Sequence, residues 1–362
     1  MPGLIDPKIA SAVARRLSGE TYDPARPEIQ RLQSDLTAAV DRSEELVASV
    51  SGISVPDPVR WAVISRAAWA EANIKGISTL IAPLADKLGA RIDTLPLPAR
   101  IAQRGFVSAE VGAMLGYVSR RVLGQYDLLV PETPPASIPG WRRRRDPTQG
   151  AALYFVGTNM VETQERHGFV PEDFALWVAV HEVTHRFQFA GVPWLRDRFF
   201  GLIGRYLASA EMDVKGFATR LAVAGKKLVS RTTPQEERNA VYLFANEEQR
   251  SILDEVQALM TVVEGHGNYV MDTVGADVIP SFSRMRGAFE KRREQTNLMQ
   301  KVINGALGLE MKMRQYELGQ QFCESVIAQG GQQALAQLWE HPDNLPNLAE
   351  LRQPHDWVKR VA

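Results

Sequence analysis

Residues 171 to 190 constrain the fold of this 362-residue chain more than any other segment, because they have helical spacing and are apolar on nearly every side. A helix that is apolar all round has to be covered by other elements. The first turn holds Pro171, Glu172 and Asp173, which are typical residues of a helix start. The segment therefore predicts a buried helix over residues 171–190, with the apolar residues Phe174, Leu176, Trp177, Val178, Val180, Val183 and Phe187.

Helical periodicity also dominates the rest of the chain. Two short segments rich in β-forming residues, Tyr126–Val130 and Ala152–Met160, are bounded by Gly or Pro and predict strands. The expected fold class is therefore mainly α with a small β element (α+β). The other predicted helices are Pro7–Leu17, Pro27–Val50, Pro58–Leu88 with interruptions near Gly76 and Pro83, Ser108–Leu123, Asp197–Ala208, Asp213–Leu228, Gln235–Asp272, Ser283–Gly305, Glu310–Gln329 and Gln332–Trp339.

The chain is expected to form a single domain over residues 1–362, which its length and composition allow. The expected parts are a helical N-terminal part (1–125), short strands with a loop (126–170), the helices around the candidate metal site (171–340) and a C-terminal loop tail (341–362). The loop Pro131–Gly150 is the only stretch with the composition of a domain boundary, and its basic run Arg142–Arg145 is typical of a solvated connection.

The composition is that of an ordinary globular protein, with 45% hydrophobic residues, 23% charged residues and a formal net charge of zero. A balanced charge argues against nucleic acid and anionic membranes as partners. No run approaches the ~18 apolar residues of a membrane span, and the first residues lack the pattern of a secretory signal. A single cysteine, Cys323, excludes an intrachain disulfide and a thiolate metal cage. We therefore expect a cytoplasmic protein, and the sequence indicates no particular protein partner.

The predicted buried helix contains two histidines four residues apart, His181 and His185, with Glu182 between them. Positions i and i+4 lie one turn apart on the same face, so both imidazoles can reach one ion at about 2.0 Å. Burying such groups without partners would cost roughly 1 to 3 kcal/mol each, which a metal and hydrogen bonds offset. This HExxH pattern predicts a Zn²⁺ site with Glu182 as the general base. A hydrogen-bonded pair of core histidines is the alternative.

A catalytic zinc site usually takes a third protein ligand. A metzincin is excluded, because Gln188 and Gly191 stand where its glycine and third histidine would be. The remaining candidates are Glu264, Glu211 and His266. Glu264 and His266 point about 200° apart on one predicted helix, so only one of them can face the ion, and periodicity does not choose between them. The flanking Gly265 and Gly267 predict the close approach of another backbone, which would fit a helix pressed against the active-site helix.

Four stretches resemble a bacterial family of zincin-like metallopeptidases. They are the HExxH turn, the segment Val263–Gly265, the segment Leu309–Gly319 around Tyr316, and a closing pattern of Leu338, Trp339, Leu345, Pro346 and Trp357. Members of that family carry labels of inferred hydrolases or of proteins associated with the biosynthesis of a deazaflavin coenzyme. The resemblance spans most of the chain from about Pro58 onward. It implies a largely helical zincin-like domain with Glu264 as the third metal ligand, which favours Glu264 over His266 and Glu211.

Three further residues are candidates for supporting roles. Asn268 and Asp272, one and two turns after Glu264, could hydrogen-bond to a ligand histidine, with surface exposure as the alternative. Tyr316 could donate a hydrogen bond to a developing oxyanion, although a core-packing tyrosine is the favoured account.

The sequence thus predicts a zinc-dependent hydrolase of metallopeptidase type (gluzincin-like, HExxH…E) that acts on a peptide or a small amide. In such an enzyme a water activated by the metal attacks the carbonyl while Glu182 takes its proton. Ala152–Met160 is the candidate for an edge strand that aligns the substrate. The alternative is a zinc-binding helical accessory protein without significant peptidase activity, linked to coenzyme biosynthesis.

Overall fold

The computed structural model describes residues 4–19, 22–55, 58–82, 96–129, 152–209, 245–294 and 309–361. These residues form helices and one small sheet, which confirms the predicted fold class. They group into two compact units, each built from several stretches of the chain. Unit 1 is Met1–Ser49, Ser54–Ala190 and Val278–Phe282, and unit 2 is Val50–Ile53, Gly191–Asp277 and Ser283–Ala362. The expected division of a single domain at residues 125, 170 and 340 stays a prediction.

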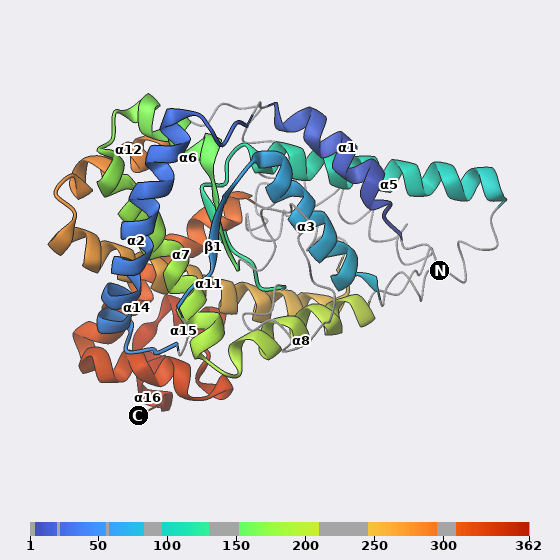
Figure 1. Ribbon diagram of the computed structural model, residues 1–362. Helices are drawn as coiled ribbons and strands as arrows, with labels where there is room; N and C mark the ends of the chain where they lie inside the picture. The colour runs from blue at the N-terminus through green and yellow to red at the C-terminus, as the bar shows by residue number, and fades with distance from the viewer. Residues whose placement is uncertain are drawn as a thin grey trace, which may run out of the picture. The chain divides into compact units, whose positions relative to one another are not determined.

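Unit 1 combines the three described strands with six helices (Figure 1). The prediction of helices near Pro7, Pro27 and Pro171 is confirmed. Each begins at its proline, where the missing N–H costs no helical hydrogen bond. The elements are α1 (Pro7–Ser18), α2 (Pro27–Ser51), β1 (Trp61–Ile64), α3 (Arg66–Leu80), α5 (Leu97–Ser119), β2 (Gly124–Tyr126), β3 (Leu153–Val156), α6 (Gly157–His167) and α7 (Pro171–Gly191).

The sheet has the strand order β1-β3-β2 among the described strands. β3 pairs in parallel with β1, with Trp61 opposite Leu153, and antiparallel with β2, with Gln125 opposite Tyr154. All four residues of β3 are buried. The expectation that Ala152–Met160 forms an edge strand is therefore wrong, because β3 has a partner on each side and α6 already begins at Gly157. β1 was not predicted, because four residues within an apolar stretch do not separate a strand from a buried helix.

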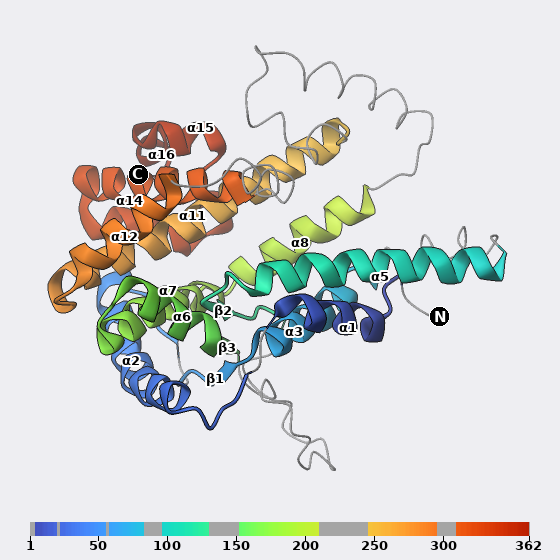
Figure 2. The same cartoon turned by 90° about the horizontal axis from the view of Figure 1, so that it is seen from above.

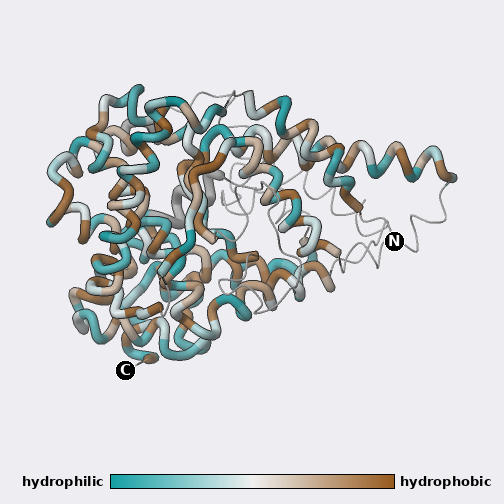
Figure 3. Tube along the Cα trace, in the orientation of Figure 1, coloured by the Kyte–Doolittle hydropathy of each residue, from teal (hydrophilic) through white to brown (hydrophobic). Residues whose placement is uncertain are grey.

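One face of the sheet packs against three helices of unit 1. Tyr154 and Val156 point to the face covered by α1, α3 and α5, where they join a buried apolar cluster that includes Trp69. α1 and α5 run side by side in both views (Figures 1 and 2). They pack closely because a Cβ at Gly112 of α5 would overlap the backbone of Ala10. Hydrophobic residues follow one another along the central strands, whereas they alternate with polar ones along α5 (Figure 3).

Unit 2 is helical in its described part. It contains α8 (Leu195–Ala208), α11 (Glu247–Val278), α12 (Phe282–Glu294) and α14 (Leu309–Glu340). Gly331 has a φ of 68° and kinks α14, which explains why the sequence predicted two helices there. The predicted helix Asp213–Leu228 lies outside the described residues. No helix in the described ranges of either unit is long and apolar enough to cross a membrane.

The described residues 341–361 do not form the loop tail that was expected for residues 341–362. They form a 3-10 turn (Pro342–Asn344) and the helices α15 (Leu348–Arg352) and α16 (Pro354–Val361). Trp357 is fully buried, packs edge-on against Phe322 of α14, and donates its indole N–H to the carbonyl of Asn344 at 2.6 Å. α15 has five residues and α16 has eight, which is too short for a helical period to be detected from the sequence.

Arg360 of α16 forms hydrogen bonds to the two preceding parts of this C-terminal segment. Its guanidinium donates to the carboxylate of Glu350 at 2.6 Å and to the carbonyls of Asp343 and Leu345 at 2.7 and 3.2 Å. Burial by itself would raise the pKa of Glu350, but the hydrogen bonds from Arg360 and from the N–H of Asn347, together with the Arg360 charge, outweigh it and lower that pKa. Glu350 therefore stabilises the fold above the pKa of an unfolded glutamate, about 4.3, and this contribution is lost as the pH falls through the lowered folded pKa.

Replacing Arg360 by alanine should lower the free energy of unfolding by about 1 to 2 kcal/mol at pH 7, because the buried Glu350 loses its charged donor. The loss should shrink below pH 4, where Glu350 becomes protonated in the variant and then in the parent. Denaturant unfolding of Arg360→Ala at several pH values checks this, with the exposed neighbour Lys359→Ala as the control. Equal stability of the two variants at pH 7 would contradict the assignment.

Candidate metal centre

Helix α7 is the buried helix that its sequence predicts. Fourteen of its residues are buried, including the stretch Phe174–Val180. Arg186, with a side chain only 1% exposed, pairs with Glu44 of α2 at 2.7 Å, and the same Glu44 oxygen accepts the N–H of Val59 just before β1. Breaking a buried pair of this kind typically costs about 3 to 5 kcal/mol. The pair therefore fixes α7 against α2 and the start of the sheet.

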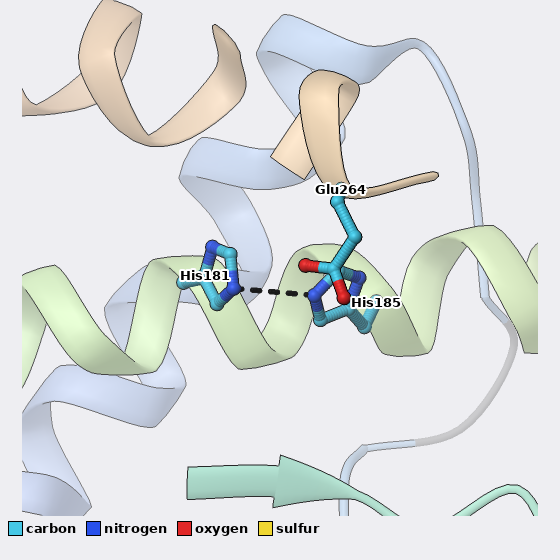
Figure 4. A group of neighbouring side chains, drawn as sticks. All are labelled: His181, His185 and Glu264. Atoms are coloured by element: carbon cyan, nitrogen blue, oxygen red, sulfur yellow. Dashed lines mark hydrogen bonds between the residues drawn. The ribbon is translucent and has the colours of Figure 1, made fainter. Parts of the chain in front are cut away.

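The two histidines of α7 turn toward each other. Their ring centroids are 4.6 Å apart, their planes are inclined by 79°, and their Nε2 atoms are 3.2 Å apart, at hydrogen-bonding distance (Figure 4). Two nitrogens bound at 2.0 to 2.1 Å to one tetrahedral zinc ion would be roughly 3.3 to 3.4 Å apart. His181 and His185 are thus already spaced as two ligands of a single ion.

Glu182 lies on the sheet side of this pair. It is buried, and its side chain packs against Gly124 of β2, where an added Cβ would be 2.7 Å from Glu182 Cγ and 3.0 Å from Oε1. No side chain larger than glycine fits at position 124 unless Glu182 moves. Strand β2 therefore holds the carboxylate of Glu182 beside the backbone of the sheet. Glu182 is the residue after His181.

Glu264 supplies the third potential ligand. It is a buried residue of α11, and one ligand atom each from His181, His185 and Glu264 lie within 4.8 Å of one another (Figure 4). His266 is buried elsewhere in unit 2, with its ring 5.0 Å from Trp339 in an edge-on arrangement. The group of side chains that could hold a metal ion contains Glu264 and not His266, and the role of Glu264 as third ligand stays a prediction.

α11, which carries Glu264, comes very close to α14 at Gly265, the residue after Glu264. A Cβ at Gly265 would overlap the backbone of Gly319 in α14, and a Cβ at Gly319 would overlap the carbonyl of Thr261. The expected close backbone approach at Gly265 is therefore confirmed. The backbone that comes close at this point belongs to α14, whereas the sequence suggested the helix of His181 and His185 as the neighbour.

The remaining candidates are Asp272, Asn268, Tyr316 and Glu211. The carboxylate of Asp272 is paired with Arg286 at 2.5 Å and accepts from Gln320 at 2.8 Å, contacts that give it a structural role within unit 2. Asn268 is buried on α11, so the alternative of surface exposure is wrong for it. Tyr316 belongs to α14, but its side chain and the whole of Glu211 lie outside the described residues, as does the run Arg142–Arg145. Contacts of Asn268, Asp272 or Tyr316 with the metal centre stay predictions.

One polar residue near the histidines was missed in the sequence. Gln188 is fully buried on α7, and its Oε1 lies 2.9 Å from Nδ1 of His185. Residues three apart share a helix face, and ligand histidines almost always donate their second ring N–H to an acceptor. The spacing of His185 and Gln188 was therefore a usable signal, although we considered Gln188 only as a departure from the metzincin pattern.

The donor set fits zinc. Two imidazole nitrogens and one carboxylate oxygen, with a fourth position left open, are the composition of one class of catalytic zinc sites. Cys323 is buried in α14, and burial raises the pKa of its thiol, which fits a structural role. A neutral imidazole pair and a carboxylate beside a buried Glu182 can together hold a divalent ion next to a proton acceptor.

Comparisons with known proteins give one similar solved structure and one matching family. A solved structure from Chloroflexus aurantiacus, described as "a putative hydrolase with a novel fold", is similar to this chain over 98% of both chains, with 30% sequence identity and a TM-score of 0.68. A comparison with curated proteins gave no match. The profile of the zincin-like metallopeptidases matches residues 5–358. The chain belongs to the family of zincin-like metallopeptidases.

Proposed function

We propose that this protein is a zinc-dependent hydrolase that cleaves an amide or peptide bond, with Glu182 as its general base. The observation that carries the proposal is the 3.2 Å separation of the His181 and His185 Nε2 atoms on a buried helix, with the carboxylate of Glu182 one residue away. Membership of the metallopeptidase family supports the same chemistry.

His181, His185 and Glu264 would hold the ion, since their ligand atoms form one group. A zinc ion there supplies a Lewis acid that brings the pKa of a coordinated water to about 7. Glu182 takes the proton from the attacking water as the new carbon–oxygen bond forms. It then gives that proton to the amide nitrogen as the carbon–nitrogen bond breaks, so the products are a carboxylic acid and an amine. Glu182 can take this role because it is not one of the three grouped ligands.

Strand β2 is the better candidate for aligning an extended substrate. In its antiparallel register with β3, Gln125 forms the hydrogen-bonded pair with Tyr154, so the N–H and C=O groups of Gly124 and Tyr126 point away from β3. β2 is also an edge strand of the described sheet and touches Glu182 through Gly124. A peptide added to this edge would pass beside the general base.

Replacing Glu182 by glutamine should reduce hydrolysis of a responsive peptide from a mixed library by about 100- to 10,000-fold, because the amide cannot accept the proton. Zinc content should stay near one ion per chain. The matched control is Glu172→Gln, which removes the same charge from the first turn of the same helix and should keep both activity and zinc. If the protein binds zinc but cleaves no peptide, and if Glu182→Gln leaves its zinc binding unchanged, it is instead the accessory protein considered above.

Replacing Glu264 by glutamine should weaken zinc binding, because a charged ligand is lost. Loss of a residue that only hydrogen-bonds to a ligand typically weakens metal affinity by roughly 10- to 100-fold, and the effect of Glu264→Gln should be larger than this. Competition with a chelator of known affinity measures this. Glu255→Gln, on the same helix but in an exposed pair with Arg198, is the control and should leave affinity unchanged. Equal zinc affinity of Glu264→Gln and Glu255→Gln would remove Glu264 from the ligand set.

A further inference from the structure

We infer that Gln188 is the positioning residue of the metal centre: it accepts the Nδ1 proton of His185 and so keeps the Nε2 lone pair of that ring available for the ion. The inference rests on the proposed zinc site and adds a residue that the HExxH pattern does not contain. It depends on the position and burial of one amide group.

The contact is short and lies within one helix. The distance from Gln188 Oε1 to His185 Nδ1 is 2.9 Å, in the usual range of an N–H···O hydrogen bond. Both residues belong to α7, three positions apart, so the regular helix places them on the same face. Gln188 is 0% exposed, and bulk water does not compete for its carbonyl.

The hydrogen bond decides which nitrogen of His185 carries the proton. With the amide oxygen toward the ring, Nδ1 is protonated and Nε2 keeps its lone pair. That Nε2 is the atom 3.2 Å from Nε2 of His181, so the lone pair is directed where the ion would be. The reversed amide would donate to Nδ1 and leave the proton on Nε2, which prevents metal ligation.

A neutral partner also tunes the ligand. A carboxylate that accepts this proton raises the basicity of the imidazole, whereas the amide of Gln188 carries no charge and raises it less. Replacing Gln188 by glutamate should therefore give zinc binding at least as tight as in the parent, and replacing it by leucine should remove the acceptor while keeping a buried side chain of similar size.

The test measures zinc affinity of the full chain by competition with a chelator. Gln188→Leu should bind zinc about 10- to 100-fold more weakly than the parent, and Gln188→Glu should restore the affinity. The control is Thr184→Val, also fully buried on α7, whose hydroxyl donates to the carbonyl of Val180 in the same helix. Thr184→Val should bind zinc as tightly as the parent.

A second readout separates positioning from mere packing. In the zinc-free parent labelled with ¹⁵N-histidine, long-range ¹H–¹⁵N NMR spectra should show the proton of neutral His185 on Nδ1, and in Gln188→Leu this preference should be lost. The spectra of the parent decide the matter even if Gln188→Leu fails to fold, because a proton found on Nε2 of His185 overturns the inference.

The outcomes also distinguish this inference from the function on which it rests. A parent that binds zinc tightly, together with a folded Gln188→Leu of equal affinity, overturns the role of Gln188 and leaves the zinc site intact. A parent that binds no zinc overturns the proposed function, and the inference with it.

Discussion

The rest of the site depends on two imidazole nitrogens that lie 3.2 Å apart on one turn of a buried helix. Two neutral rings with both Nε2 lone pairs turned to the same point repel each other unless a proton or a cation lies between them. Placing them in an apolar helix makes this arrangement costly without such a partner. The buried course of α7, its ion pair with α2 and the packing of Glu182 on β2 all serve to keep this one turn in place.

Glycine is used where a backbone has to come close to a functional side chain. At Gly124 the absence of a Cβ lets the carboxylate of Glu182 lie directly against β2. At Gly265 it lets α11 cross α14 at the residue next to Glu264. In both places the chain gives up a packing side chain and in return fixes the position of a carboxylate through rigid backbone contacts. In the proposed reaction, a carboxylate held in this way would need little reorganisation.

Much of this could be predicted from the sequence, because the signals were local. The apolar run around His181 predicted a buried helix, and Pro7, Pro27 and Pro171 marked the starts of three helices. The HExxH spacing placed two imidazoles on one face. What the sequence did not reveal depends on contacts between distant segments. β1 looked like part of a helix, β3 was expected at an edge although it has two partners, and the helices after Pro342 are too short for periodicity. The choice of Glu264 over His266 needed the resemblance, since helical geometry treats both residues alike until the neighbours of each are known.

The most direct test of the central claim is an X-ray absorption measurement at the zinc edge on the purified, zinc-loaded chain. The account predicts one zinc ion per chain with two imidazole nitrogens at about 2.0 to 2.1 Å, oxygen ligands at about 2.0 to 2.2 Å and no sulfur. A spectrum without imidazole scattering, or a protein that retains no stoichiometric zinc, would contradict the claim that His181 and His185 share one ion.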